Sequence, residues 1–234
     1  MARGDRVRVA DFYGNRIASL PSSVASLVGL TRLRLSNNRL ASPAVAWEAL
    51  CSLPNLAILA MENNALAGDV PACVGGLAKL EALALDGNEL SSLPAEMGRL
   101  ASLERLSVAK NKLRALPPEL ASCARLDAVD ARWNLMTAVP AELADAPRLR
   151  SLLLDNNRIV LDGLPSALLS ASRALAELSV HGNNVRMEEL RELPGWEVYD
   201  ARRRARAGKV LESRVMLGDK AFDEGADVER FHRH

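Results

Sequence analysis

Residues 103–113 read LERLSVAKNKL, and this stretch decides the fold. Its first, fourth and sixth positions are Leu103, Leu106 and Val108, with polar or small residues between them. Such alternation is typical of a short strand that is buried on one side. An asparagine, Asn111, follows at the ninth position and Leu113 at the eleventh.

The same frame, L-x-x-L-x-L-x-x-N-x-L, recurs along the chain. Its asparagine returns at intervals of 23 to 26 residues, as Asn15, Asn38, Asn64, Asn88, Asn111, Asn134, Asn157 and Asn183. A period in this range, with this frame, marks a leucine-rich repeat solenoid, whose repeats must stack because one repeat cannot bury its apolar face alone. The sequence therefore predicts an α/β solenoid: a leucine-rich repeat horseshoe with about eight repeats. We expect a parallel β-sheet on the concave side and short helices and extended segments on the convex side.

The repeated asparagine is expected to be structural. Its side chain should turn inward after each strand and bond backbone groups of the turn. Left unpaired, such buried groups cost roughly 1–3 kcal/mol each.

Composition agrees with one solenoid domain. The chain has 234 residues, of which 49% are hydrophobic and only 3% aromatic, so the core is built from Leu, Val and Ala. The formal net charge of +1 argues against an obligate binder of nucleic acid or of an anionic membrane. No apolar stretch approaches 18 residues, and the first residues show no apolar signal segment.

The three cysteines are Cys51, Cys73 and Cys123, and their spacing shows neither a disulfide-bonded cap nor a metal site. Cys123 occupies a core position of its repeat. The absence of such caps and of Asn-x-Ser/Thr sequons favours a reducing, intracellular setting, which is cytoplasmic or, if a basic run acts as a localisation signal, nuclear.

We expect three segments: a solenoid over 1–194, a capping helix with a basic run over 195–209, and a polar, partly flexible tail over 210–234. On the convex side, one helix is expected from Ser42 to Leu53, with Ser42 as its N-cap and Trp47 in the core. Helices are also expected near Leu164, over 187–193 and from Trp196 to about residue 206. Trp196 and Tyr199 should close this end of the core.

The two ends of the solenoid are expected to differ. No comparable cap is visible before the first repeat, so its apolar residues Phe12, Ile17, Val24 and Leu27 are expected to form an open end through which chains self-associate. The basic run Arg202, Arg203, Arg204, Arg206 and Lys209 is either the solvated side of the capping helix or a nuclear-localisation or anion-binding patch.

The segments between and after the repeats resemble one family. These are residues 38–48, residues 167–191, residues 199–204 and residues 222–227. They are similar to plant leucine-rich repeat proteins that carry an N-terminal ubiquitin-like domain, within the broader intracellular Ras-group-related class. The resemblance spans nearly the whole chain and implies no catalytic residues. No ubiquitin-like domain is visible in this sequence, so a link to ubiquitin signalling is not carried over from the family name.

The candidate binding surface is the concave face. We expect it to have a basic end, an acidic middle with an apolar floor, and a mixed remainder. The candidate partner-binding residues are Arg32, Arg34, Ile58, Glu62, Asp86, Arg105, Asp130, Arg132, Trp133, Leu153 and Asp155. This mixture suits a protein partner, because a nucleic-acid groove needs continuous basic charge with stacking aromatics. Trp133 is either an exposed interface anchor or a side chain lying flat on the neighbouring turns.

The sequence therefore predicts an intracellular scaffold or adaptor that binds a protein through its concave face. A second hypothesis is a regulatory subunit in ubiquitin or small-GTPase signalling that acts through the C-terminal tail. A third is a structural module that assembles through the open N-terminal end. No catalytic, metal or cofactor site is expected, because no phosphate loop, nucleophile elbow or metal motif occurs.

Overall fold

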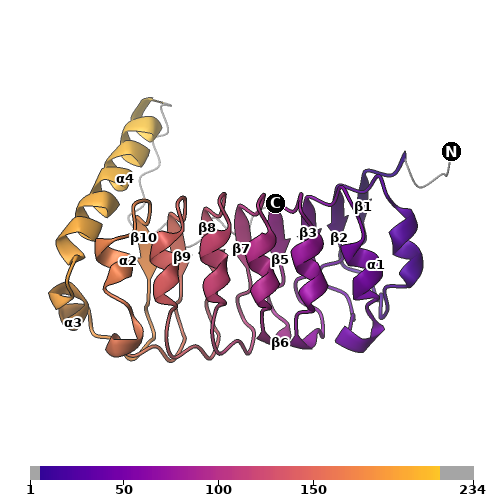
Figure 1. Ribbon diagram of the computed structural model, residues 1–234, viewed down its shortest axis with the longest axis horizontal. Helices are drawn as coiled ribbons and strands as arrows, with labels where there is room; N and C mark the ends of the chain where they lie inside the picture. The colour runs from indigo at the N-terminus through magenta and orange to yellow at the C-terminus, as the bar shows by residue number, and fades with distance from the viewer. Residues whose placement is uncertain (1–5, 217–234) are drawn as a thin grey trace.

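A computed structural model describes residues 6–216 of the chain, with side chains for residues 6–207. The repeats stack in one row, with strands on one side and short helices on the other (Figure 1). The main sheet is parallel and has eight strands in the order β1-β2-β3-β5-β7-β8-β9-β10. The leucine-rich repeat solenoid that the spacing predicts is confirmed.

Each repeat contributes one strand of three residues to this sheet. The strands are β1 (Val9–Asp11), β2 (Arg32–Arg34), β3 (Ile58–Ala60), β5 (Ala82–Ala84), β7 (Arg105–Ser107), β8 (Ala128–Asp130), β9 (Ser151–Leu153) and β10 (Glu177–Ser179). Each central residue pairs with the central residue of the next strand, as Leu83 does with Leu106. These central side chains point into the core, so the flanking positions face the concave side. A second, two-stranded sheet joins β4 (Ala67–Asp69) to β6 (Glu89–Ser92).

Short 3-10 helices form most of the convex side. They are η2 (Ser22–Ser26), η3 (Ser42–Ala44), η4 (Ala72–Gly76), η5 (Ala95–Arg99), η6 (Pro118–Ser122), η7 (Ala141–Asp145) and η8 (Leu161–Gly163). A proline at the N-cap precedes five of them, as Pro94 precedes η5. The two 26-residue repeats have room for an α-helical turn, in α1 (Trp47–Cys51) and α2 (Ala167–Ser170).

The single helix expected from Ser42 to Leu53 is wrong, because that segment contains two short helices, η3 and α1. Ser42 does not cap a helix with its side chain. Its hydroxyl donates to the carbonyl of Ala67 at 2.5 Å and accepts from the Ala67 amide at 2.8 Å. Val45 between the helices is extended and pairs with Leu20. These long-range bonds override the local helix signal. Trp47 lies in the core, as expected.

The repeated asparagines bond the turns as expected. The Nδ2 of Asn111 donates to the carbonyls of Leu85, Val108 and Ala109 at 3.0, 3.1 and 3.2 Å. Its Oδ1 accepts from the amide of Leu90 at 3.0 Å. Two of these partners belong to the preceding repeat. Each asparagine therefore closes its own turn and ties it to a neighbour, and together they form the asparagine ladder (Asn38, Asn64, Asn88, Asn111, Asn134, Asn157 and Asn183).

Two helices cover the C-terminal end of the row (Figure 1): α3 (Met187–Glu192) and α4 (Trp196–Met216). Tyr199 is buried, and its hydroxyl accepts a hydrogen bond from the Leu178 amide at 2.9 Å. Trp196 packs against the core with its ring 5.6 Å from that of Tyr199. Both residues therefore close this end of the core. The helix continues beyond residue 209, where we expected the capping segment to end, because Lys, Leu, Glu and Arg favour helix. The division into three segments stays a prediction.

The described part of the basic run contributes to this cap. Arg202 donates to the carbonyls of Leu175 at 3.0 Å and Leu169 at 2.7 Å. The pKa of Arg202 is lowered by burial. Arg203 and Arg204 both pair with Asp200 on α4 itself. These contacts favour the solvated-helix interpretation over a localisation signal; the side chain of Lys209 lies outside the described residues.

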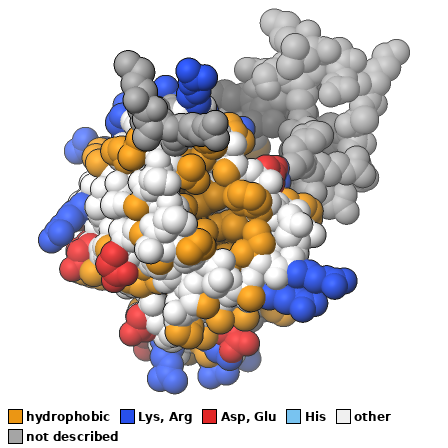
Figure 2. Space-filling model, turned by 90° about the vertical axis from the view of Figure 1, so that its right-hand side faces the viewer, with side chains coloured by type: hydrophobic (Ala, Val, Ile, Leu, Met, Phe, Trp, Pro, Cys, Tyr) orange, Lys and Arg blue, Asp and Glu red, His pale blue; other side chains and the backbone are white. Residues whose placement is uncertain are grey.

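The N-terminal end exposes apolar side chains. Figure 2 shows them gathered at this end of the row. Strand β1 is the edge of the described sheet. Phe12 is 43% exposed and Val9 is 53% exposed, whereas Ile17 and Leu27 are half-buried. Val24 differs from expectation: it is buried, because η2 packs against α1 of the next repeat.

We expect Asn111→Ala to lower the free energy of unfolding by about 1–3 kcal/mol, because it leaves buried backbone groups unpaired. Chemical denaturation measures this. Asn184→Ala is the control, because Asn184 is exposed and lies outside the ladder. Equal stability of the two variants would contradict a structural role for the ladder.

Hydrogen exchange tests the exposed end. In a dilute monomeric sample, amides of residues 7–29 should exchange faster than those of residues 80–125, because within the described sheet β1 has a hydrogen-bonded neighbour on one side only. Equal protection of the two segments would show that the first repeat is adequately covered.

Candidate functional site

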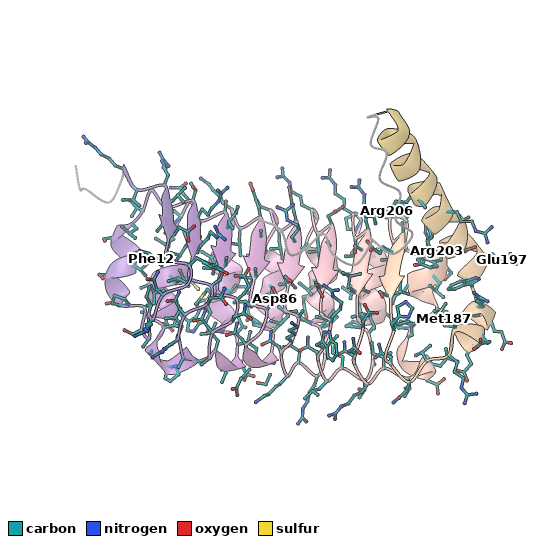
Figure 3. All side chains as sticks on the ribbon, turned by 180° about the vertical axis from the view of Figure 1, so that it is seen from behind. Phe12, Asp86, Met187, Glu197, Arg203 and Arg206 are labelled. Carbon is teal, nitrogen blue, oxygen red and sulfur yellow. The ribbon has the colours of Figure 1, made fainter. Side chains whose placement is uncertain are left out.

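A groove of about 910 Å³ runs along the concave face from the first turn to β9. Eight of the eleven candidate residues line it: Arg34, Glu62, Asp86, Arg105, Asp130, Arg132, Trp133 and Leu153. Arg32, Ile58 and Asp155 lie outside its lining. Figure 3 views the molecule from the strand side, with Asp86 near the middle of the row and Arg203 and Arg206 at the α4 end.

The floor of the groove is made of small side chains. Ala82 and Ala84 on β5 and Ala128 on β8 are half-buried, and Ser151 on β9 is buried. Leu153 lies beside them but is only 8% exposed, so it forms part of the groove floor and does not project toward a partner. A flat floor with taller side chains at its rim leaves room for a chain to lie across the strands.

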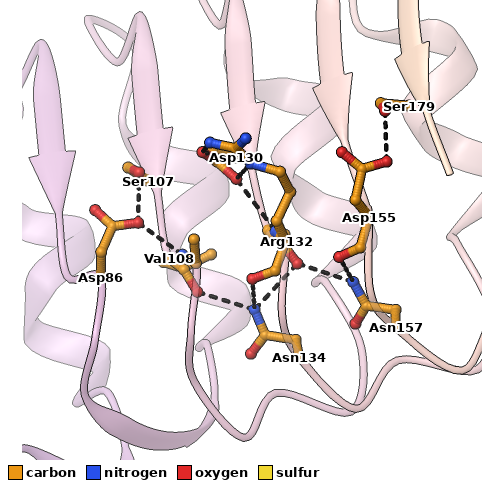
Figure 4. A network of polar contacts seen from close by, with 11 residues as sticks. Asp86, Ser107, Val108, Asp130, Arg132, Asn134, Asp155, Asn157 and Ser179 are labelled. Atoms are coloured by element: carbon orange, nitrogen blue, oxygen red, sulfur yellow. Dashed lines mark hydrogen bonds and ion pairs between the residues drawn. The ribbon is translucent and has the colours of Figure 1, made fainter. Parts of the chain in front are cut away.

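Acidic side chains of the concave face bond to the protein itself (Figure 4). The Oδ1 of Asp86 accepts from the hydroxyl of Ser107 at 2.6 Å and from the amide of Ala109 at 2.8 Å. Asp155 repeats this arrangement with Ser179 and with the amide of His181. Burial raises the pKa of Asp86, while the two hydrogen bonds act in the opposite direction. Each acid thus caps the following repeat and has less capacity left for a partner.

Asp130 is likewise occupied within its own repeat. The Arg132 guanidinium binds both of its oxygens, with Nε 2.9 Å from Oδ1 and Nη2 2.6 Å from Oδ2. Asp130 is only 7% exposed, so a partner meets Arg132 rather than the carboxylate. The hydrogen bonds to Asp130 raise the pKa of Arg132.

Trp133 is the largest exposed side chain of the groove, with 56% of its surface accessible. It does not lie buried on the ladder. Its backbone is left-handed, with φ at 58°. The eighth position of every repeat has this conformation, and the residues found there are Gly14, Asn37, Asn63, Gly87, Lys110, Trp133, Asn156 and Gly182. Glycine and asparagine adopt it most readily, whereas a bulky residue pays a conformational cost. The chain therefore presents an indole where its backbone would favour asparagine.

Two cations of the groove are not used by the fold. Arg105 and Lys110 are exposed and line the groove. Among the described side chains, neither forms an ion pair. The exposed charge of the groove is therefore mainly positive, although its acidic residues are nearly as numerous.

One aromatic residue of the groove is absent from the partner-binding residues predicted from the sequence. Tyr13 lines it, is 56% exposed, and has the Arg34 guanidinium 5.6 Å from its ring centre. Arg34 also pairs with Asp11 at 3.0 Å. Tyr13 occupies the seventh position of the first repeat, one place before the position of Trp133, so the repeat frame contained the signal.

The described residues contain no cluster of three or more His, Cys, Asp or Glu side chains that would hold a metal ion. His181 is exposed, and His232 and His234 lie outside the described residues. None of the described helices combines the length and the hydropathy needed to cross a bilayer.

Comparison with known proteins agrees with this geometry. Residues 29–90 match the family model described as leucine rich repeat. The chain is 39% identical over 224 residues to plant intracellular Ras-group-related LRR protein 8 of Oryza sativa subsp. japonica, which covers 96% of this chain and 58% of that protein. It is 42% identical over 64 residues to an LRR repeats and ubiquitin-like domain-containing protein of Arabidopsis thaliana, covering 27% of this chain and 17% of that one.

Solved structures share the fold. The Arabidopsis receptor kinase HAESA, solved in complex with the peptide hormone IDA and the co-receptor SERK1, superposes with a TM-score of 0.66 at 25% identity. The match covers 80% of this chain and 33% of that one.

The eight stacked strands and their asparagine ladder define a leucine-rich repeat protein, a class that generally mediates protein–protein interaction and is typically not enzymatic. Its homologues are the plant intracellular Ras-group-related LRR proteins and an LRR protein with a ubiquitin-like domain, as the resemblance implied. The chain spans little more than half the length of the rice relative.

We expect Trp133→Asn to leave the free energy of unfolding unchanged or to raise it by up to about 1 kcal/mol, because asparagine suits the left-handed backbone. Thermal or chemical unfolding measures this. The control is Trp47→Ala in the core, which should lose about 3–5 kcal/mol. A comparable loss for Trp133→Asn would show that the indole serves packing instead.

Proposed function

We propose that this chain is an intracellular adaptor that binds an extended segment of another protein in its concave groove. The observation that carries the proposal is Trp133, an exposed indole held in a left-handed backbone beside the groove. Exposed Trp and Arg side chains are the residue types that dominate binding energy at protein interfaces. Arg132 lies beside the indole in sequence and is fixed by Asp130, so little side-chain entropy is lost when a partner binds.

The partner is expected to carry carboxylates and an apolar or aromatic anchor. The acids Asp86 and Asp155 are engaged by serine hydroxyls and backbone amides, whereas Arg105 and Lys110 have no ion-pair partner among the described side chains. Lys110 and Trp133 occupy equivalent positions of adjacent repeats, so they are neighbours along the groove. A carboxylate placed beside an anchoring group would contact both.

The comparisons support a protein partner. The rice relative is named an intracellular protein, which supports an intracellular adaptor. HAESA, which shares the fold, is solved with a bound peptide hormone, which supports a peptide segment as the ligand. The alternative of a signalling subunit that acts through the C-terminal tail rests on residues 210–234, most of which lie outside the described residues.

A peptide-display selection tests the proposal. Peptides selected on the wild-type chain should be rich in Asp and Glu around an aromatic or aliphatic residue. Their affinity should fall at least tenfold for Trp133→Asn, which keeps the backbone conformation and removes the indole. Arg105→Glu should weaken acidic peptides further as salt is lowered.

Val198→Asn is the matched control. Val198 is also an exposed apolar residue, but it lies on α4 outside the groove lining. Its replacement should leave affinity unchanged. If Trp133→Asn binds the selected peptides as tightly as wild type, or if Val198→Asn loses them equally, the concave groove is not the binding site.

A further inference from the structure

Two cysteines far apart in the described sequence meet on the convex side. Cys51 is the last residue of α1, and Cys73 is the second residue of η4 in the next repeat. Their sulfur atoms are 2.6 Å apart. Atoms in ordinary contact stay roughly 3.5–4.0 Å apart, whereas a disulfide bond measures about 2.0 Å. The two sulfurs therefore point at each other at a separation closer to that of a bond than of a contact.

This cysteine pair was not predicted from the sequence, because its spacing matches neither a disulfide-bonded cap nor a metal site. The signal was the repeat itself. The two cysteines are separated by 22 residues, close to one repeat length, so stacking brings them to neighbouring places on the convex side. Helix α1 packs directly against η4, which fixes the two backbones that carry them.

We propose that Cys51 and Cys73 are a reversible oxidation site, which forms a disulfide linking α1 to η4 when the chain meets an oxidised low-molecular-weight disulfide such as glutathione disulfide. Both side chains are half-buried at the protein surface, so a small oxidant reaches them. In a reducing compartment the pair remains two thiols, which agrees with an intracellular protein.

The chemistry takes two exchange steps. The thiolate of Cys73 attacks one sulfur of the oxidant, forms a mixed disulfide and releases one thiolate. Cys51 then loses its proton to solvent and attacks the Cys73 sulfur, which releases the second thiolate. Two protein thiols are oxidised and one external disulfide is reduced to two thiols. Burial, together with a hydrogen bond to Cys73, raises the pKa of Cys51, so we place Cys51 in the second step, after that hydrogen bond has been lost.

Cys123 provides an internal contrast. It is fully buried, and its sulfur donates to the carbonyl of Met97 at 3.2 Å rather than to another sulfur. Burial raises its pKa to about 11. Cys123 should therefore remain a free thiol under conditions that oxidise the pair.

The bond would join two consecutive repeats near the exposed N-terminal end. It would close a loop that contains β3 and β4, and such cross-links restrict the unfolded chain. Oxidation should therefore slow hydrogen exchange across residues 47–76 and raise the melting temperature by several degrees, both reversed by dithiothreitol. The concave groove lies on the opposite side of the repeats and is not changed by the bond.

Glutathione redox buffers test the proposal on the purified chain. Oxidation should remove two of three titratable thiols, lower the mass by two hydrogens and leave no glutathione attached. Trypsin leaves both cysteines in one peptide, because no Lys or Arg lies between Arg39 and Lys79. Cleavage after glutamate separates them at Glu62 and should give a cross-linked pair of peptides.

Cys123→Ser should still form the cross-link, and Cys73→Ser should form none. The thiol count, the mass and the peptide map of the wild-type chain test the proposal even if a variant fails to fold. Three thiols remaining in a fully oxidising glutathione buffer, a stable glutathione adduct on either cysteine, or a cross-link only between separate chains would each overturn the proposal.

Discussion

The rest of the structure depends on one side-chain amide that bonds four backbone groups in each repeat from the second to the eighth. A strand of three residues forms few bonds of its own, and the turn after it buries amides and carbonyls that water cannot reach. Asn111 satisfies these groups on both its own repeat and the preceding one. The ladder therefore does more than close turns: it sets the position of each repeat relative to its neighbour, which helps to align the strands and to place the groove.

This constraint divides the side chains into two sets. Positions on the core side are mostly leucines, valines and alanines, and because they are buried they do not contact a partner. The concave positions are free to vary, yet the fold uses several of them as well: Asp86 and Asp155 cap the following repeat, and Asp130 holds Arg132. The net result is a groove whose counted charges nearly balance, but whose groups available to a partner are mainly cationic.

Much of the fold was predictable from the sequence because the repeat frame specifies it locally. The strands and the ladder follow from position in the frame. The burial of Trp47 and the C-terminal closure by Trp196 and Tyr199 follow instead from the apolar side chains of the convex and capping helices. The convex helix from Ser42 was not predictable, because a bond to Ala67 in the next repeat decides it. The frame predicts which candidate residues lie on the concave face. It does not predict which of them are free to contact a partner, because the pairing of Arg132 with Asp130 and the burial of Leu153 arise from contacts that the frame does not encode.

The regular spacing of the left-handed turn positions also limits how a ligand segment can lie along the row. Neighbouring strands of a sheet are about 4.8 Å apart. A ligand segment in the polyproline II conformation advances about 3.1 Å per residue and returns to the same side-chain direction at every third residue. Three residues of a segment lying across the strands therefore span about the same length as two repeats. Such a segment would come into phase with the row at every third residue, so that side chains three apart would meet Trp133 and the turn of Gly87, or Trp133 and that of Gly182. The solenoid would thus favour ligands whose sequence pattern repeats every three residues.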